Sequence, residues 1–279
     1  MIIHSAARTA ELAAVKQTEN PFAAWNNVAA TATLSGTAVL TDGDRSNAVS
    51  GTTFDYWLPD VTGTAAQFRI TMGAAATLSC IGFAVHNLGT LGGSVKVERS
   101  TDSGATWSST DLGGTHTPTD DSPIVFRIAT TGLDAAAWRL NFTGLTAGDP
   151  LFVGVMFFGN EMVFPRRFYS GFAPAVAPTE VQLQSNVSVG GNLLGSSIIA
   201  QGSTLTASFQ NVDPDFVRGD MLPFIPHFNA GKGFLFGWRP ATYPQDVHYC
   251  WRDGATLRPA NSGVVDFMAF DMPMRAFEA

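Results

Sequence analysis

The sequence predicts an all-β protein, and three observations lead to that fold class. Short apolar or alternating runs recur along most of the chain, and clusters of turn-forming residues separate them. The 279 residues include 28 Gly and 15 Pro, which interrupt strands, and many Thr and Val, which suit pleated surfaces. The strands do not alternate with long helical segments, so the pattern is typical of sandwiches or barrels and not of βαβ units.

Residues 1–19 are expected to form a separate N-terminal segment. The stretch from Ala6 to Ala14 has high helix propensity but is short. From Asn20 onward the signals are those of strands. Strands in the region that follows are predicted at Ala66–Met72, Thr77–Val85, Gly93–Arg99, Ile124–Ile128 and Ala137–Phe142.

A change of pattern predicts a connector at residues 161–178. A buried strand at Phe152–Phe158 precedes it, and Pro174 and Pro178 favour extended backbone within it. The chain is therefore expected to hold a first domain at residues 20–160 and a second at residues 179–279. The second opens with predicted strands at Glu180–Ser188, Leu193–Ala200 and Thr204–Val212.

One short helix and three further strands are expected to complete the second domain, as a β-sandwich. Asp213 is a predicted N-cap, with Pro214 at the first helical position, for a helical stretch at residues 214–228. Pro223 and Pro226 keep that helix short. The strands that follow are predicted at Phe234–Trp238, Asp246–Trp251 and Val264–Met272.

Charge and hydropathy exclude two kinds of partner. The net charge is −7 and Arg166-Arg167 is the only basic pair, so no basic surface for nucleic acid is expected. No apolar run reaches the roughly 18 residues of a membrane span. The start, Met1–Arg8, lacks the order of a signal peptide, which predicts synthesis and retention in a cytoplasm. Cys80 and Cys250 are expected to be buried free thiols in different domains.

Residues 20–160 resemble the discoidin, or galactose-binding-like, family. The matching segments are the Leu40–Asp44 loop, the strands Phe68–Met72 and Thr77–Phe83, and the S-x-D-x-G-x-x-W hairpin within Val95–Trp107. In that hairpin a tight turn places Gly104 at positive φ, and Trp107 packs back on the sheet. The resemblance implies a jelly-roll sandwich whose loops at one end bind glycans or other ligands.

The Asp42-Gly43-Asp44 loop has two interpretations. Related domains hold a structural Ca²⁺ in the corresponding loop, and carboxylates around a glycine suit a hard cation. Asp42, Asp44 and Asn47 would then be ligands, together with Thr41 and backbone carbonyls. The same residues also form an ordinary turn that needs no metal. Both interpretations stay open, and no other cofactor is expected.

Candidate ligand-binding residues in the first domain are few: Trp25, Tyr56, Trp57 and His86. Sugar sites combine aromatic faces with polar groups, which these residues supply. Because Tyr56 and Trp57 are adjacent, one of them points inward if they lie on a strand. Each of the four is also compatible with a place in the core. The loops between the strands are rich in Gly, Ala and Thr and offer few side-chain donors.

No catalytic constellation is evident, and the protein is not expected to be an enzyme. The five histidines lie far apart and show no metal-ligand spacing. Nucleophile-elbow and phosphate-loop motifs do not occur in the sequence. Asp120-Asp121 lies in a Pro-flanked loop and Asp213 is a predicted cap, so neither favours the acid pair of a glycosidase.

The second domain resembles the β-sandwich of bacteriophage tail-tip proteins, in the style of distal tail proteins and lambda-type minor tail protein M. The shared order is an alternating strand (Ser203–Gln210), a helix begun by Asp213-Pro214, an apolar strand ending at Trp238, and two closing strands. In that family no residue is catalytic, and function lies in shape, because copies form a closed ring.

The resemblance implies a structural component of a phage tail tip or baseplate, located in the virion and made in the host cytoplasm. Its expected partners are other copies of itself in a ring and the tube, hub and fibre proteins of the tail. The jelly roll would serve for protein contacts or for a host surface glycan. The alternative is a standalone carbohydrate-binding, lectin-like protein.

Overall fold

The computed structural model describes residues 1–168, 171–175, 180–263 and 266–277. The chain is 43% strand and 10% helix, which confirms the all-β prediction. It divides into a first unit, residues 1–167 and 233–249, and a second unit, residues 168–232 and 250–278. These units differ from the predicted boundaries, because residues 1–19 and 233–249 belong to the first unit.

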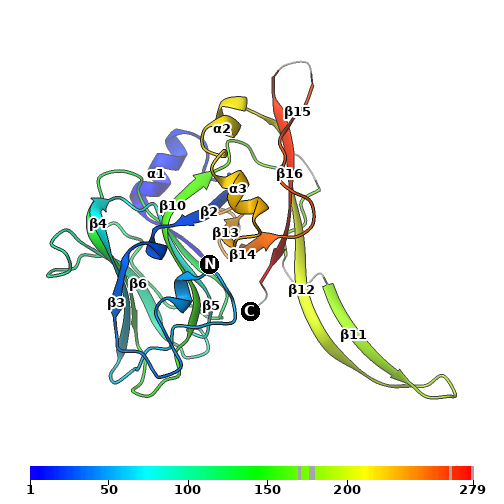
Figure 1. Cartoon of the computed structure of the whole chain (residues 1–279), viewed down its shortest axis with the longest axis horizontal. Helices are drawn as coiled ribbons and strands as arrows, with labels where there is room; N and C mark the ends of the chain where they lie inside the picture. The colour runs from blue at the N-terminus through cyan, green and yellow to red at the C-terminus, as the bar shows by residue number, and fades with distance from the viewer. Residues whose placement is uncertain (169–170, 176–179, 264–265, 278–279) are drawn as a thin grey trace. The chain divides into compact units, whose positions relative to one another are not determined.

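Two sheets form the sandwich of the first unit (Figure 1). The larger runs in the order β1 (Ile2–His4), β8 (Ile124–Arg127), β5 (Cys80–His86), β10 (Val153–Val163), β2 (Phe22–Asn27) and β13 (Phe234–Gly237). The smaller runs in the order β3 (Thr33–Gly36), β4 (Ala65–Ala76), β9 (Ala135–Thr143), β6 (Ser94–Ser100) and β7 (Thr115–His116).

The core of the first unit lies between these sheets and is rich in aromatic rings. Phe68 on β4 lies 5.3 Å from Trp57 and 6.1 Å from Phe158 on β10, measured between ring centroids. Phe142 on β9 lies 5.3 Å from Phe83 on β5. The rings come from both sheets. Alternate side chains of each strand point inward, and there the rings of one sheet pack against those of the other.

Long-range pairing places the N-terminal segment and β13 in the first unit. β1 pairs in parallel with β8, and β13 pairs with β2. Between β1 and β2 lies the expected helix, α1 (Ala6–Ala14), which begins at Ser5, whose side chain accepts a hydrogen bond from the Arg8 amide at 3.2 Å. These partners are distant in sequence, and local pattern therefore does not indicate them.

The hairpin after β6 has the geometry that its motif predicts. Gly104 has φ of +99°, and a Cβ there would lie 2.2 Å from the guanidinium of Arg69. Trp107 packs back on the smaller sheet, with the guanidinium carbons of Arg139 and Arg69 lying 4.2 and 5.3 Å from its ring centroid.

The second unit contains one antiparallel sheet, in the order β14, β16 (Met268–Ala276), β12 (Leu193–Val212) and β11 (Glu180–Val187). β14 (Val247–Arg252) begins in the first unit and ends in the second, where residues 250–252 pair with β16. The short β15 (Ala260–Asn261) also pairs with β16. The predicted strand at 264–272 lies partly outside the described residues, as does Pro178 of the connector.

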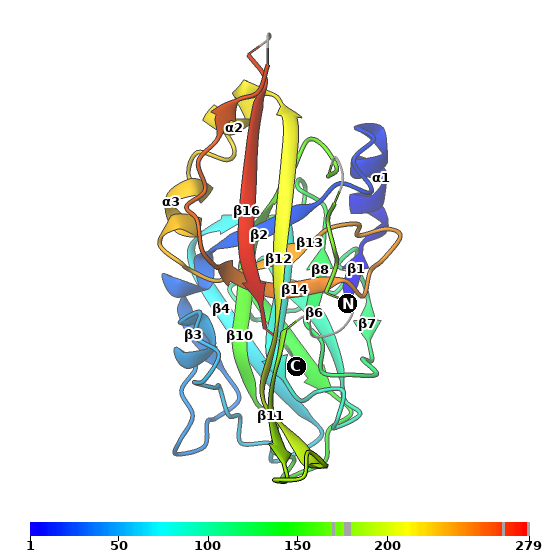
Figure 2. The same cartoon turned by 90° about the vertical axis from the view of Figure 1, so that its right-hand side faces the viewer.

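The two strands predicted at residues 193–200 and 204–212 are in fact one, because β12 continues without a break from Leu193 to Val212. β12 is 20 residues long. Its first half pairs with β11 and its second half with β16, so a different neighbour supports each half (Figures 1 and 2). The hairpin of β11 and β12 therefore extends beyond the end of β16.

Two short helices, α2 (Pro214–Arg218) and α3 (Phe224–Asn229), replace the single helical stretch that was predicted. The predicted cap is confirmed, since the Asp213 side chain accepts from the Asp215 amide at 2.9 Å. Gly219 ends α2, and Pro223 precedes α3. Among the described residues no helix is long and apolar enough to span a membrane. Cys80 and Cys250 are buried free thiols, as predicted.

Candidate functional site

The arm is the part of the second unit that stands out by its exposure. We define it as residues 181–202, the hairpin of β11 after Glu180 with the first half of β12. Every residue of β11 is exposed. Large apolar side chains on both strands are exposed as well, with Leu183 at 56%, Leu193 at 68% and Ile198 at 59%. Soluble monomers seldom expose contiguous apolar surface of this kind.

Strand register gives the arm two different faces. Leu183 pairs with Ile198 and Val187 with Leu193, and paired residues of an antiparallel ribbon project to the same side. Val181 shares that side by alternation along β11. We call this the apolar face; its large side chains are Val181, Leu183, Val187, Leu193 and Ile198. Leu194 and Ile199 are also exposed, but they stand at the two register shifts of the hairpin and are assigned to neither face.

The opposite side of the arm is the polar face. It carries Gln182, Gln184 and Asn186 from β11, and Ser197, which pairs with Gln184. Residues 181–203 contain no Asp, Glu, Lys or Arg. The arm is thus an uncharged two-faced ribbon in a chain of net charge −7.

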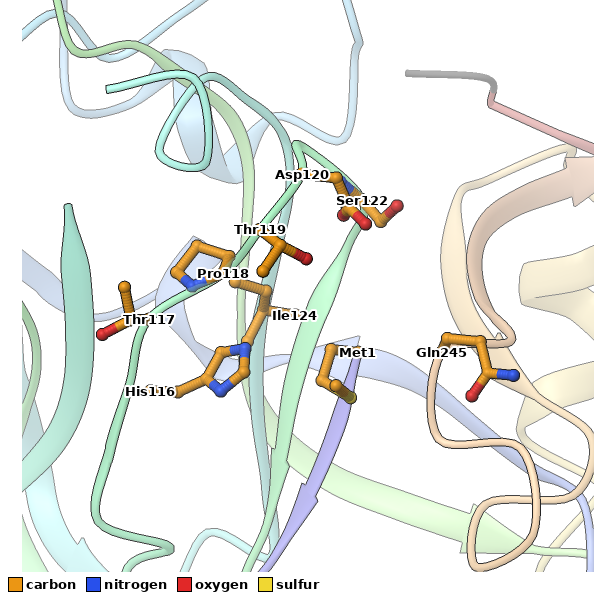
Figure 3. A pocket seen from close by; sticks show the side chains of 9 residues that line it. All are labelled: Met1, His116, Thr117, Pro118, Thr119, Asp120, Ser122, Ile124 and Gln245. Carbon is orange, nitrogen blue, oxygen red and sulfur yellow. Dashed lines mark hydrogen bonds between the residues drawn. The ribbon is translucent and has the colours of Figure 1, made fainter. Parts of the chain in front are cut away.

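A cavity of about 250 Å³ lies in the first unit, on the loop that leads from β7 to β8 (Figure 3). Met1, Pro118 and Ile124 supply apolar groups to its wall. The polar groups come from His116, Thr117, Thr119, Asp120, Ser122 and Gln245. Figure 3 shows Gln245 on a separate loop, across from the loop that carries Thr119 and Asp120.

Hydrogen bonds with neighbouring residues hold the loop between β7 and β8 in place. The Asp121 carboxylate accepts from the amide of Thr90 at 3.0 Å and from its hydroxyl at 2.5 Å. His86 accepts through Nδ1 from the Leu88 amide at 3.2 Å, so its Nε2 carries the proton and donates to the Ser122 carbonyl at 3.0 Å. The Asp120 carboxylate accepts from the Ser122 amide at 2.9 Å. The loop is therefore positioned by the neighbouring loop after β5.

Burial and hydrogen bonds also fix the charge states around the loop. Burial lowers the pKa of His86 to about 4, although the hydrogen bond to Ser122 opposes the shift. His86 is therefore neutral near pH 7. Burial likewise lowers the pKa of His116, and hydrogen bonds from Ser122 lower that of Asp120. The loop thus presents one carboxylate and a neutral imidazole to the cavity.

The four residues predicted from the sequence as ligand-binding do not line this cavity. Trp57 is fully buried in the core and His86 is 3% exposed behind the loop. Tyr56 is half-buried, with its ring 5.0 Å from that of Phe152, and Trp25 is half-buried on β2. Sequence reasoning considered Asp120-Asp121 as a catalytic pair only. The clustering of Thr, Asp and Ser between His116 and Ser122 is the signal that would have identified the loop.

The Asp42-Gly43-Asp44 loop is occupied by hydrogen bonds of its own. Asp44 accepts from the Ser46 amide at 2.7 Å and from its hydroxyl at 2.9 Å, and Asn47 donates to the Tyr56 carbonyl at 3.1 Å. A Cβ at Gly43 would lie 2.5 Å from Leu58, so packing alone requires glycine there. Among the described residues no three His, Cys, Asp or Glu side chains gather as metal ligands. These hydrogen bonds favour the plain-turn interpretation of the loop, and calcium binding is untested.

No family model matches the chain, and no curated protein matches it. Solved structures with some likeness include chitosan-binding module 1 of a chitosanase/glucanase from Paenibacillus sp. IK-5, at 16% identity and TM-score 0.37, covering 50% of this chain and 98% of that chain. Module 2 of that enzyme, in complex with chitotriose, has 16% identity and TM-score 0.38, covering 48% and 99%.

A fucosidase from Ruminococcus gnavus, a mutant in complex with fucose, has 13% identity and TM-score 0.40. The likeness covers 49% of this chain and 27% of the fucosidase. These identities and scores are too low for a ligand or an activity to be carried over to this chain.

Proposed function

We propose that the protein is a structural subunit that assembles with further copies of itself through the arm, as a component of a phage tail tip or baseplate. The observation that supports the proposal is the exposed apolar face of the arm. Its five large side chains are between 45% and 68% exposed. Burying such a face against a neighbour stabilises an assembly by roughly 25 cal/mol for each Å² of apolar area removed from water.

The partner proposed for the arm is a second copy of this chain. Identical charged arms packed side by side would repel one another, whereas residues 181–203 carry no charge and meet no such penalty. The chain's net charge of −7 would otherwise oppose close self-association. An uncharged arm on an acidic chain is therefore suited to the place where copies meet.

The unpaired strand edges of the arm also favour a second copy of this chain as the partner. β11 ends the sheet order of the second unit, and in the described chain its outer edge has no strand partner. An unpaired edge is a template for a further strand. Pairing the β11 edge of one copy with the exposed β12 edge of the next is a heterologous contact, and such contacts close into rings when the rotation between copies allows it.

Assembly through the arm is tested with a matched pair of double variants of the full chain. Leu183→Lys with Ile198→Glu places opposite charges on the apolar face, at residues that pair directly. Gln184→Lys with Ser197→Glu places the same charges on the polar face, again at a direct pair. Oligomeric state is measured by light scattering coupled to size-exclusion chromatography, with electron microscopy of the purified protein.

We expect oligomers from the unaltered chain and from the polar-face variant, and monomers from the apolar-face variant at an unchanged melting temperature. An unaltered chain that stays monomeric across the concentration range would contradict assembly. Equal assembly by both variants would contradict the role of the apolar face. Co-purification with tail particles, in several copies per particle, tests the proposed location in the virion.

In this proposal the assembly presents the first unit to other tail proteins or to a host glycan. No residue has a catalytic role in it. The alternative, a standalone carbohydrate-binding protein, leaves the apolar face without a partner. The two are distinguished by assembly, because a standalone lectin-like protein would bind sugar without forming rings.

A further inference from the structure

We infer that residues 1–14 form a strap that detaches from β8 when the medium is acidified and leaves β8 as an open edge of the larger sheet. The strap consists of β1 and α1. In the described chain β1 is the last strand of that sheet, and β8 is its strand neighbour. Every residue involved lies in the first unit, so assembly through the arm has no part in the release.

Strand register places His4, Arg127 and Cys80 in one row across three strands. His4 on β1 pairs with Arg127 on β8, and Arg127 pairs in turn with Cys80 on β5. Paired residues of adjacent strands project to the same side of the sheet, so the side chains of His4 and Arg127 are neighbours. Arg127 and Cys80 are both 0% exposed. A titratable side chain of the strap therefore lies beside a fully buried cation.

Charge is balanced around this row as long as the imidazole of His4 is neutral. Glu161 on β10 accepts hydrogen bonds from Arg127 and from Arg8 of the strap. Arg8 also donates to Glu11 at 2.8 Å. Two guanidiniums thus face two carboxylates. A proton on His4 adds a third positive charge opposite Arg127, and like charges at directly opposed positions of neighbouring strands are destabilising.

Acidification favours the detached strap because His4 binds a proton more readily there. In the attached strap burial lowers the pKa of His4 to about 4, and Arg127 and Arg8 add to the shift. Glu161 and a hydrogen bond with the Pro240 carbonyl oppose the shift only in part. The detached side chain takes the ordinary pKa of 6.5. The detached strap therefore binds more protons between those values, and the attached state loses stability as pH falls from 6.5 toward 4.

Few contacts hold the strap, so it opens more readily than the core. β1 forms three residue pairs with β8, and Ile2 and Leu12 are the large apolar side chains that the strap buries, at 4% and 2% exposed. Regions with few buried apolar contacts open locally at a lower free energy than the core. The chain stays attached beyond the strap, where Glu19 accepts from the Thr242 hydroxyl at 2.5 Å and forms an ion pair with Arg239 at 3.6 Å.

Release of the strap frees one edge of β8. The Val125 amide donates to the Met1 carbonyl at 2.9 Å, and the Arg127 carbonyl accepts from the Ser5 amide at 2.9 Å. Without the strap these groups lack their backbone partners, and an unpaired edge is a template for a strand of another chain. Acidification is therefore converted into a surface for strand pairing.

The test follows the reaction of Cys80 with 4,4′-dithiodipyridine in the full chain at pH 7 and pH 5. Cys80 reports on the strap because it pairs with Arg127 and is buried while the strap is attached. Its rate is divided by that of glutathione at the same pH, which corrects for the intrinsic reactivity of a thiol. Cys250, a buried thiol of the second unit, controls for unfolding of the whole chain. Hydrogen exchange of residues 2–14 and of β9 is measured in parallel.

Two variants separate His4 from the other histidines. His4→Asn removes the titrating group, and His116→Asn is the matched control, at a half-buried histidine of β7 in the same unit. We expect the corrected rate of Cys80 to rise about twentyfold from pH 7 to pH 5 in the unaltered chain and in His116→Asn, which is the factor for a pKa that moves between about 4 and 6.5. His4→Asn should show a much smaller rise. Exchange should quicken in the strap and not in β9.

An equal rise in His4→Asn and in the unaltered chain would overturn the inference, as would a Cys80 that stays unreactive at pH 5. Reaction of Cys250 in step with Cys80, or an equal quickening of exchange in β9, would also overturn it, because each shows unfolding and not release of the strap. Where His4→Asn loosens the strap at both pH values, exchange of residues 2–14 against β9 in the unaltered chain is the deciding measurement.

Discussion

Arg127 on β8 and Glu161 on β10 form an ion pair in the interior of the first unit, with both side chains fully buried. Arg127 donates through Nη2 to one carboxylate oxygen at 3.0 Å and through Nε to the other. Arg8 of α1 donates to the same carboxylate through Nε at 2.9 Å. The network therefore attaches the N-terminal helix to the larger sheet.

The first prediction is that Glu161→Gln strongly destabilises the first unit. Burial raises the pKa of Glu161, but Arg127 and Arg8 outweigh that effect and the net shift is downward, so the carboxylate is ionised near pH 7. Removing one charge of a buried network costs about 3–5 kcal/mol. That is a large share of the about 5–15 kcal/mol that stabilises an ordinary domain. Urea unfolding measures the loss.

Glu180→Gln is the matched control for this prediction. Glu180 lies 3.5 Å from Arg275, with side chains 50% and 39% exposed, and exposed pairs contribute about 0–1 kcal/mol. Equal losses of unfolding free energy from Glu161→Gln and Glu180→Gln would show that the buried network contributes no more than an exposed ion pair.

The second prediction concerns acid lability caused by His86. Its pKa is lowered to about 4 in the fold, against 6.5 for the ordinary side chain. The folded state therefore binds fewer protons than the unfolded state between those values, and stability is lost as pH falls from about 6.5 toward about 4. The loss should be on the order of 2–3 kcal/mol.

Unfolding at pH 7 and pH 5 measures this effect. His86→Asn keeps an acceptor for the Leu88 amide but does not titrate, so its stability should fall less between the two pH values. His4, whose pKa burial and Arg127 also lower to about 4, leaves a residual dependence. An unchanged pH dependence in His86→Asn would contradict the assignment.

The third prediction addresses the Asp42-Gly43-Asp44 loop. Because Asp44 is already hydrogen-bonded to Ser46, we expect a chelator to leave the melting temperature unchanged. A bound cation would add stability by mass action, so its removal would lower the melting temperature. A chelator-sensitive melt that Asp42→Ala abolishes would establish calcium in this loop instead.

The fourth prediction concerns Trp238, which the sequence placed at the end of an apolar strand of the second domain. It lies in the first unit and is half-buried; its Nε1 donates to Asp246 at 2.8 Å and its ring lies 5.4 Å from Tyr243. Trp238→Ala should therefore destabilise the first unit by about 2 kcal/mol, less than the roughly 3–5 kcal/mol of a fully buried ring. Trp238→Phe keeps an aromatic ring but removes the hydrogen bond and part of the indole, and it should lose at least about 1 kcal/mol.

Differential scanning calorimetry would show which unit Trp238 stabilises. The transition assigned to the first unit should move and that of the second unit should not. A shift confined to the second unit would contradict the placement of Trp238.

Features that depend on neighbouring residues could be predicted from the sequence. The N-cap at Asp213, the positive φ of Gly104 and most strands followed from local geometry and alternation, and each is present in the structure. Side-chain period and turn chemistry act over a few residues, so they can be read along the chain.

Features that depend on residues distant in sequence could be seen only in the folded structure. The parallel pairing of β1 with β8, the place of β13 beside β2, and the cavity formed by Asp120 and Gln245 join residues more than a hundred positions apart. The two faces of the arm depend on register, because Leu183 and Ile198 share a face only through their pairing. A shift of one residue would reverse those faces, and no local pattern fixes such a choice.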